Sequence, residues 1–151
     1  MAESVRIAQA NLGERVGAEL REQSKQAMVI TLKLRYADFT TITRRHTLRQ
    51  PSDTDQTIFD TGVKLLKKTL SQEKQKVRLI GIGVSNLTEP GRQLDMLDSS
   101  TQRLWQLNEA IDRIRKKYGF TAIQTGRTLL LKDIFPTEKE GYTLHTPSLS
   151  R

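Results

Sequence analysis

Ile30-Thr31-Leu32-Lys33-Leu34-Arg35-Tyr36 is the stretch that decides the fold. Its apolar residues alternate with polar and basic ones, so one face of an extended strand is apolar and the other is basic. We therefore predict a strand over residues 29–36 that rests one face on a core and leaves the other face open.

A second strand is predicted directly after the first. The segment 37–40 suits a tight turn, and residues 41–48 place their threonines and Arg45 on one parity. Ile42 and Leu48 lie on the other parity, which Arg44 and His46 interrupt. This interruption indicates an edge strand whose inner face is only partly covered.

A third strand is predicted over residues 77–85. Its inner face is β-branched, whereas Gly81, Gly83 and Ser85 share the opposite face. Two glycines on one face weaken a strand and usually mark a place where another backbone comes close.

Three helices are predicted from apolar residues at three- and four-residue spacing. The first covers residues 4–23, the second starts near Pro51 with Asp53 as its N-cap and ends near Leu70, and the third covers 101–119. The sequence thus predicts an α+β fold, an antiparallel sheet of three to four strands with two helices packed on one face. We expect a domain over 1–87, a loop over 88–100, an additional C-terminal helix, and a tail over 120–151 that is disordered from about Pro136.

Composition excludes several classes of site. The 151 residues contain no cysteine and only two histidines, so disulfides, thiolate zinc sites, a cysteine nucleophile and a histidine metal cage are excluded. No apolar run approaches a membrane span and no hydrophobic signal core is present, which predicts a cytoplasmic protein without membrane contact. Gly81 and Gly83 lie inside a strand and do not form a dinucleotide loop. Asp53, Asp55 and Asp60 lie at a helix start, where capping explains them better than catalysis. We find no catalytic constellation.

The net charge of +8 is concentrated in two stretches. Residues 25–49 and 64–78 each hold six bases against one acid. If the three strands share a sheet, its open face gathers hydroxyls, cations and bare backbone: Thr31, Lys33, Arg35, Thr41, Thr43, Arg45, Thr47, Gly81, Gly83 and Ser85. Such groups bind phosphate oxygens, whereas single-stranded bases would call for exposed aromatics. A solvated face of an ordinary antiparallel sheet would look the same, so the residues alone leave both interpretations open.

Two longer motifs carry a family resemblance. They are Leu32-Lys33-Leu34-Arg35-Tyr36-Ala37-Asp38-Phe39-Thr40-Thr41-Ile42-Thr43-Arg44 and Val77-Arg78-Leu79-Ile80-Gly81-Ile82-Gly83-Val84-Ser85-Asn86-Leu87. Over residues 10–87 the chain resembles the C-terminal little finger domain of Y-family translesion DNA polymerases, in particular the DNA polymerase IV branch. The resemblance implies a little-finger-like sheet whose open face lies along the major groove and contacts the backbone of duplex DNA. The implied DNA-binding residues are Lys33, Arg35, Thr41, Thr43, Arg44, Arg45, Thr47, Arg78, Gly81, Gly83 and Ser85. Leu79 and Gly83 stand where some members carry arginine.

The resemblance also implies what this chain lacks. The palm carboxylates that hold the Mg²⁺ ions of a polymerase would lie upstream of Met1, so we expect no cofactor in this chain and no polymerisation by it alone. The first strand of the family's domain is missing too. Its place would be filled by a tail segment such as Ala122 to Gln124, or by a second copy of the chain in a homodimer through the open sheet edge.

A short loop motif suggests a protein partner. The peptide Gln93-Leu94-Asp95-Met96-Leu97 resembles the peptide by which many bacterial polymerases bind the sliding clamp, with Leu97 in place of the more usual phenylalanine. Short peptides of this kind also recur by chance. The alternative function is therefore a protein-interaction module that binds the clamp or itself and has little affinity for DNA.

Overall fold

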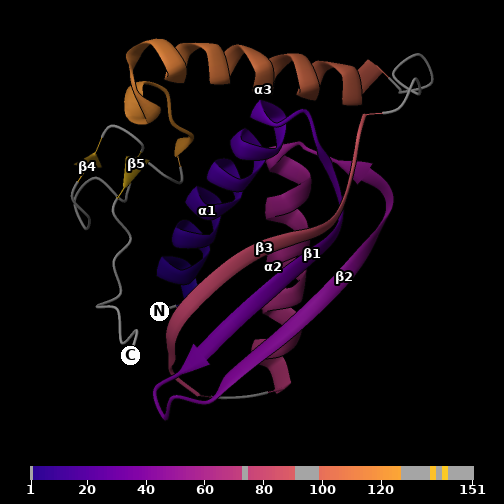
Figure 1. Ribbon diagram of the computed structural model, residues 1–151. Helices are drawn as coiled ribbons and strands as arrows, with labels where there is room; N and C mark the ends of the chain where they lie inside the picture. The colour runs from indigo at the N-terminus through magenta and orange to yellow at the C-terminus, as the bar shows by residue number, and fades with distance from the viewer. Residues whose placement is uncertain (1, 73–74, 91–98, 127–136, 139–140, 143–151) are drawn as a thin grey trace.

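The computed structural model describes residues 2–72, 75–90, 99–126, 137–138 and 141–142 (Figure 1). The chain runs through α1 (Ala2–Glu22), β1 (Gln26–Tyr36), β2 (Thr41–Ser52), α2 (Asp55–Gln72), β3 (Val77–Thr88) and α3 (Ser99–Tyr118). A short 3-10 helix η2 (Phe120–Ala122) and the strands β4 (Thr137–Glu138) and β5 (Gly141–Tyr142) follow. The predicted α+β class is confirmed.

The sheet contains three strands in the order β2-β1-β3, with both pairs antiparallel. A tight turn joins β1 to β2, in which the Tyr36 N–H donates to the Thr40 carbonyl at 2.9 Å. Phe39 has a φ of 68°, and the Asp38 carboxylate accepts the Thr40 N–H at 2.9 Å. The central strand is therefore the alternating stretch from which the fold was predicted.

The β2–α2 junction differs from the prediction. The strand continues to Ser52 through a register shift opposite residues 27–29, and Pro51 is tolerated there because an edge strand has an outward side without ladder bonds. The helix begins later, and its cap is Thr54, whose Oγ1 accepts the Thr57 N–H at 3.4 Å. Asp53 was predicted as the N-cap, and this was wrong because a different residue accepts the first free N–H groups.

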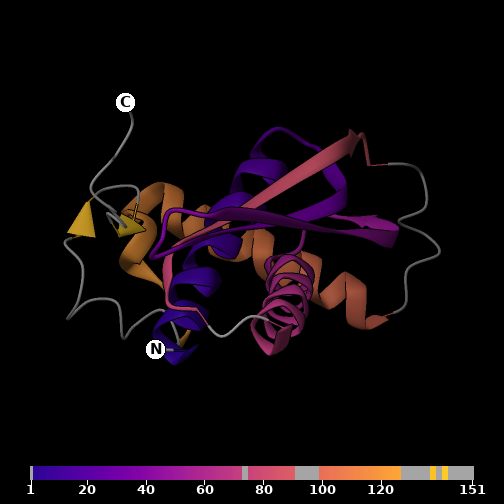
Figure 2. The same ribbon diagram turned by 90° about the horizontal axis from the view of Figure 1, so that it is seen from below.

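The core lies between the sheet and two helices, α1 and α2, which cover one face only (Figures 1 and 2). On β1 the side chains of Ile30, Leu32, Leu34 and Tyr36 are each at most 1% exposed. Leu20, Ile58 and Leu66 from the helices complete two buried clusters with them. No element among the described residues covers the other face of the sheet, which Figure 1 turns toward the viewer.

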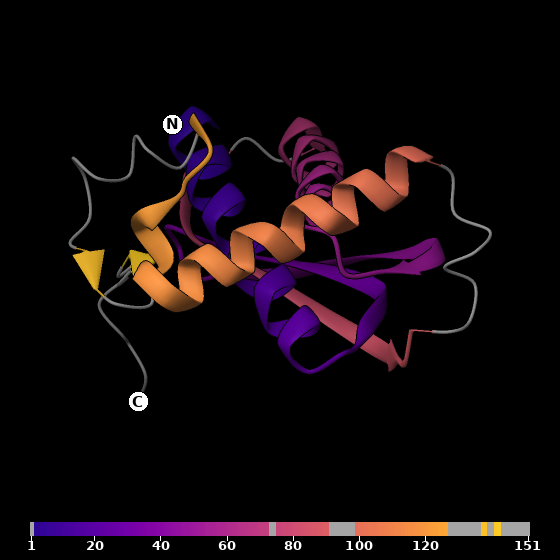
Figure 3. The same ribbon diagram turned by 90° about the horizontal axis from the view of Figure 1, so that it is seen from above.

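The third helix lies across one end of the molecule. Figure 3 looks down on α3, which crosses above α1 and α2. After it, Ala122 ends the 3-10 helix and Ile123 leads onward as extended backbone outside the sheet. The segment Ala122 to Gln124 therefore does not supply a fourth strand.

The sequence analysis did not predict the pair β4–β5. No described helix is long and apolar enough to cross a membrane.

Candidate nucleic-acid interface

The strand register brings the predicted site residues side by side. Across the sheet the rows read Arg45–Thr31–Gly83, Thr43–Lys33–Gly81, Thr41–Arg35–Leu79 and Thr47–Val29–Ser85. The alternate rows carry the buried Ile30, Leu32 and Leu34 and so face the helices. All ten residues predicted for one surface thus share the side of the sheet away from α1 and α2, which we call the open face.

Three cations of the open face, Lys33, Arg35 and Arg45, form no ion pair with a described acid. The Arg35 Nε donates to the Thr41 Oγ1 at 3.0 Å, which holds the guanidinium across the strand pair. Unpaired cations on one surface give it a positive potential, and this favours a polyanionic partner.

The two glycines of β3 are not required by the packing of the domain. A Cβ added at Gly83 would meet nothing within 4 Å, and one at Gly81 would meet only the Lys33 Cβ at 3.7 Å. Neither glycine has a positive φ. The fold would accept a side chain at both positions. The glycines are therefore better explained by a partner that approaches the backbone of β3 than by the packing of the sheet.

Two predicted DNA-binding residues lie outside the four rows of the open face. The register pairs Arg44 with Leu32 on the helix-covered side, where its Nη1 donates to the Thr43 carbonyl at 3.1 Å. Arg78 lies near the β1–β2 turn, with its guanidinium 4.6 Å from the centroid of the Phe39 ring. The resemblance implies DNA contact for both. The place of Arg44 follows from strand parity, as the sequence predicts, whereas Arg78 lies where the register shifts between Arg35 and Tyr36.

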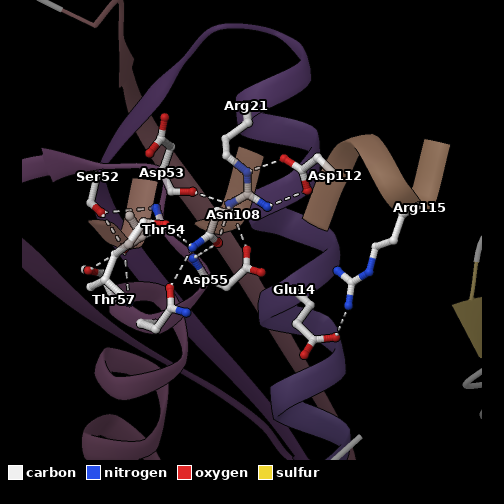
Figure 4. Close-up of polar contacts among 12 residues, drawn as sticks. Glu14, Arg21, Ser52, Asp53, Thr54, Asp55, Thr57, Asn108, Asp112 and Arg115 are labelled. Atoms are coloured by element: carbon white, nitrogen blue, oxygen red, sulfur yellow. Dashed lines mark hydrogen bonds and ion pairs between the residues drawn. The ribbon is translucent and has the colours of Figure 1, made fainter. Parts of the chain in front are cut away.

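A buried polar network at the other end of the domain was not predicted. Arg21 of α1 donates to both carboxylate oxygens of Asp112, to Asp55 Oδ1 at 2.9 Å, to the Asp53 carbonyl at 2.7 Å and to Asn108 Oδ1 at 3.0 Å (Figure 4). It therefore joins α1, the start of α2 and α3 through one guanidinium.

Asn108 completes this network from α3. Its side chain is fully buried, accepts the Asp55 N–H at 3.2 Å, and donates to Gln56 Oε1 at 3.0 Å and to the Leu104 carbonyl at 2.7 Å. A polar position on an amphipathic helix is normally assigned to solvent, so the sequence gives little signal for this contact. These hydrogen bonds join α3 to α1 and to the start of α2.

A second buried ion pair lies beside the first. The Arg115 Nη2 donates to Glu14 Oε2 at 3.1 Å, and Thr125 donates to the other oxygen at 3.2 Å. Burial raises the pKa of Glu14, while the charge of Arg115 acts in the opposite direction.

Gly17, on the same helix as Glu14, must be glycine, because an added Cβ would lie 2.0 Å from Asp55 Oδ1.

Asp55 is predicted to make stability depend on pH. Burial raises its pKa from 3.8 to about 6, although the Arg21 charge lowers it. Between pH 3.8 and 6, Asp55 is protonated in the folded state but ionised in the unfolded state. The contribution of Asp55 to the free energy of unfolding is therefore largest below pH 4 and is lost as the pH rises to 6. Relative to Asp55→Asn, which cannot titrate, the wild-type protein should lose on the order of 2–3 kcal/mol over that range. Urea denaturation from pH 4 to 8 measures this difference, and a constant difference would contradict the prediction.

One hollow formed by described residues lies away from the open face. It is a groove of about 930 Å³ between α1 and α3, to which Trp105 contributes. Its cations alternate with carboxylates such as Glu19 and Asp112, so its potential is mixed rather than positive. The described residues also contain no group of three side chains suited to hold a metal ion. The clamp-like peptide Gln93-Leu94-Asp95-Met96-Leu97 lies outside the described residues.

Comparison with known proteins gives one consistent result. Residues 2–96 match the family model described as the impB/mucB/samB family C-terminal domain. Over 124 residues the chain is 45% identical to a DNA polymerase IV of Dehalococcoides mccartyi, a match that spans 82% of this chain and 32% of that protein. It is 36% identical over 117 residues to a DNA polymerase IV of Desulfatibacillum aliphaticivorans, covering 75% of this chain and 29% of that protein. The corresponding protein of Brucella melitensis is 34% identical over 135 residues, covering 85% and 30%.

The extent of these matches bears on α3. A match of 124 residues within a chain of 151 extends well past residue 96, where the family model ends, and takes in α3. The chain spans about a third of the length of the curated relatives. It therefore corresponds to a C-terminal domain and not to a whole relative.

Proposed function

Since the chain belongs to the impB/mucB/samB C-terminal domain family, we propose that it is the DNA-gripping domain of a Y-family polymerase and binds duplex backbone through its open face during lesion bypass. The domain itself performs no chemistry in this proposal. It holds the template-primer duplex in the cytoplasm while the polymerase acts.

The observation that supports this proposal most strongly is the composition of the open face. Lys33, Arg35 and Arg45 lie there without a described acidic partner, between threonine hydroxyls and two glycines that the packing does not require. Cations, hydroxyls and backbone N–H groups are the donors that bind phosphate oxygens, and they carry no base specificity. We therefore expect binding that tolerates any sequence and depends strongly on salt.

A titration of labelled primer-template at two salt concentrations tests the proposal. If the three open-face cations each neutralise one phosphate, a plot of log K against log[salt] should have a slope of about −2.7 or steeper. Duplex should bind more tightly than a single strand of equal length, since the four described rows of the face contain no aromatic for base stacking. Absence of duplex binding at both salt concentrations would favour the protein-interaction module instead.

Gly83→Val separates folding from binding. Valine suits a strand better than glycine, and its Cβ has room, so the free energy of unfolding should rise by up to about 1 kcal/mol. Duplex affinity should nevertheless drop at least about tenfold, because the isopropyl group holds the phosphates away from the strand. Gly126→Val is the matched control, since its Cβ also has open space. Unchanged affinity of the Gly83 variant would show that no backbone approaches the face there.

The peptide Gln93-Leu94-Asp95-Met96-Leu97 remains a proposed clamp-binding segment. In the sequence it lies between the end of β3 and the start of α3. Replacing Gln93 and Leu94 with alanine should abolish clamp binding in a pull-down with purified sliding clamp and leave duplex affinity unchanged. Retained clamp binding by the double variant would rule this peptide out.

A homodimer is a separate proposal for the open sheet edge. Among the described residues, no strand pairs with the outer edge of β3. A second copy paired there would double the 17.2 kDa mass in light scattering at high concentration. A single mass of one chain at all concentrations would exclude it.

A further inference from the structure

Edge strand β2 carries cations on both of its faces. Arg45 lies on the open face, whereas Arg44 lies on the helix-covered side in the row of Leu32. Arg44 is nevertheless exposed, because β2 is the outer strand of the sheet and α2 covers it only in part. The basic surface therefore continues around the edge of the sheet instead of ending there.

A pocket of about 270 Å³ lies on this far side, between β2 and the C-terminal half of α2. It is lined by Arg44, Arg45, Leu65, Lys68, Thr69 and Gln72. Half of the lining residues are cationic and none is acidic. No carboxylate in the described ranges pairs with any of the three cations. Like charges gathered in this way repel one another, and a bound anion would relieve the repulsion.

The chemistry of the lining favours a phosphate group. A guanidinium presents a planar fork that matches two phosphate oxygens, and a lysine ammonium adds a point charge. The Thr69 hydroxyl donates to the Leu65 carbonyl at 2.8 Å, so the cations are left to hold the ligand. Arg45 also borders this pocket, but the register places its side chain on the open face, so Arg44 and Lys68 are the cations of the far side.

We propose that the pocket between β2 and α2, with Arg44 and Lys68 as its cations, is a second phosphate site, which binds backbone of the same duplex around the outer edge of β2. This inference rests on the proposed function of the open face. The major groove of B-DNA is about 12 Å wide and admits a two-stranded ribbon, so an edge strand inside it has phosphates on both sides. The cations on the two faces of β2 match that arrangement.

The test is the double variant Arg44→Gln/Lys68→Gln, measured by fluorescence anisotropy with labelled duplex across a salt series. Both side chains are exposed, so the fold should be retained, which a thermal melt checks. The slope of log K against log[salt] should become shallower by about 1.8, and affinity at 0.15 M salt should fall at least about tenfold. The control Arg103→Gln/Lys117→Gln removes the same charge from α3 and should change the slope far less.

Two further arms separate the alternatives. An NMR titration with inorganic phosphate alone should shift the amides around Thr69. If it does so but the double variant binds duplex normally, the pocket takes free phosphate and not duplex, and the inference is overturned. A slope no shallower than that of the control variant also overturns it. A variant without the open-face cations, measured in parallel, separates the two proposals. If only this variant binds duplex more weakly, the second site fails and the proposed function stands. If neither variant binds more weakly, both proposals fail.

Discussion

Duplex binding is expected to weaken by about 100-fold at 0.15 M salt when Lys33, Arg35 and Arg45 are together replaced by glutamine. The register places these three side chains on the open face, and none has an acidic partner among the residues described. Each lost cation leaves about 0.9 counterion unreleased, so the slope of log K against log[salt] should become shallower by about 2.7. Fluorescence anisotropy with labelled duplex over a salt series measures both quantities.

The matched control removes three exposed cations from α3. Arg103→Gln, Arg113→Gln and Lys117→Gln together give the same net charge as the open-face variant, but they lie at the end of the domain. If binding depended only on total charge, the two triple variants would weaken it equally. Equal losses would therefore contradict a role for the open face and leave a non-specific basic protein.

The largest expected effect on stability comes from Arg21→Met. Methionine keeps much of the apolar stem of Arg21 but removes the N–H groups that donate hydrogen bonds to Asp55, Asp112 and Asn108. Two buried or half-buried carboxylates would then lack their cation, and breaking such a network costs about 3–5 kcal/mol. Urea denaturation should show this loss at pH 7. Trp105, the single tryptophan, lies on α3 beside this network, so its fluorescence should report release of the helix before global unfolding.

Arg103→Met provides the control for this change. Arg103 is exposed on α3 and makes no ion pair with a described residue, so the same substitution there should cost less than about 0.5 kcal/mol. A loss below about 1 kcal/mol for Arg21→Met would mean that α3 is held by its apolar contacts, and that the polar network is incidental to its attachment.

The sheet and its two faces could be predicted because strand geometry has a period of two. Once Leu32 and Leu34 are assigned to the core, Lys33 and Arg35 must point the other way. The same parity predicts the pairing of the glycine face of β3 with them, and the register confirms it. Strand parity also predicts that Arg44 lies on the side of Leu32, and the register confirms it, although the resemblance groups Arg44 with the DNA-binding residues.

The attachment of α3 could not be predicted from the same pattern. Its contact with the domain uses Asn108 and Arg115, which are buried polar residues, while Leu107 on the same helix is half exposed. Helical periodicity assigns apolar residues inward, and only the partners supplied by Arg21 and Glu14 make the reverse arrangement stable. Those partners are about a hundred residues away in the chain, and local sequence carries no signal for such pairs.

Binding of DNA to the open face is tested most directly by an amide NMR titration of the chain with duplex DNA. The predicted result is a contiguous set of shifts at Thr31, Lys33, Thr43, Gly81 and Gly83, with the amides around Arg21 and Asn108 unchanged. Shifts confined to α3 or to the groove beside Trp105, with the rows of the open face unaffected, would contradict it.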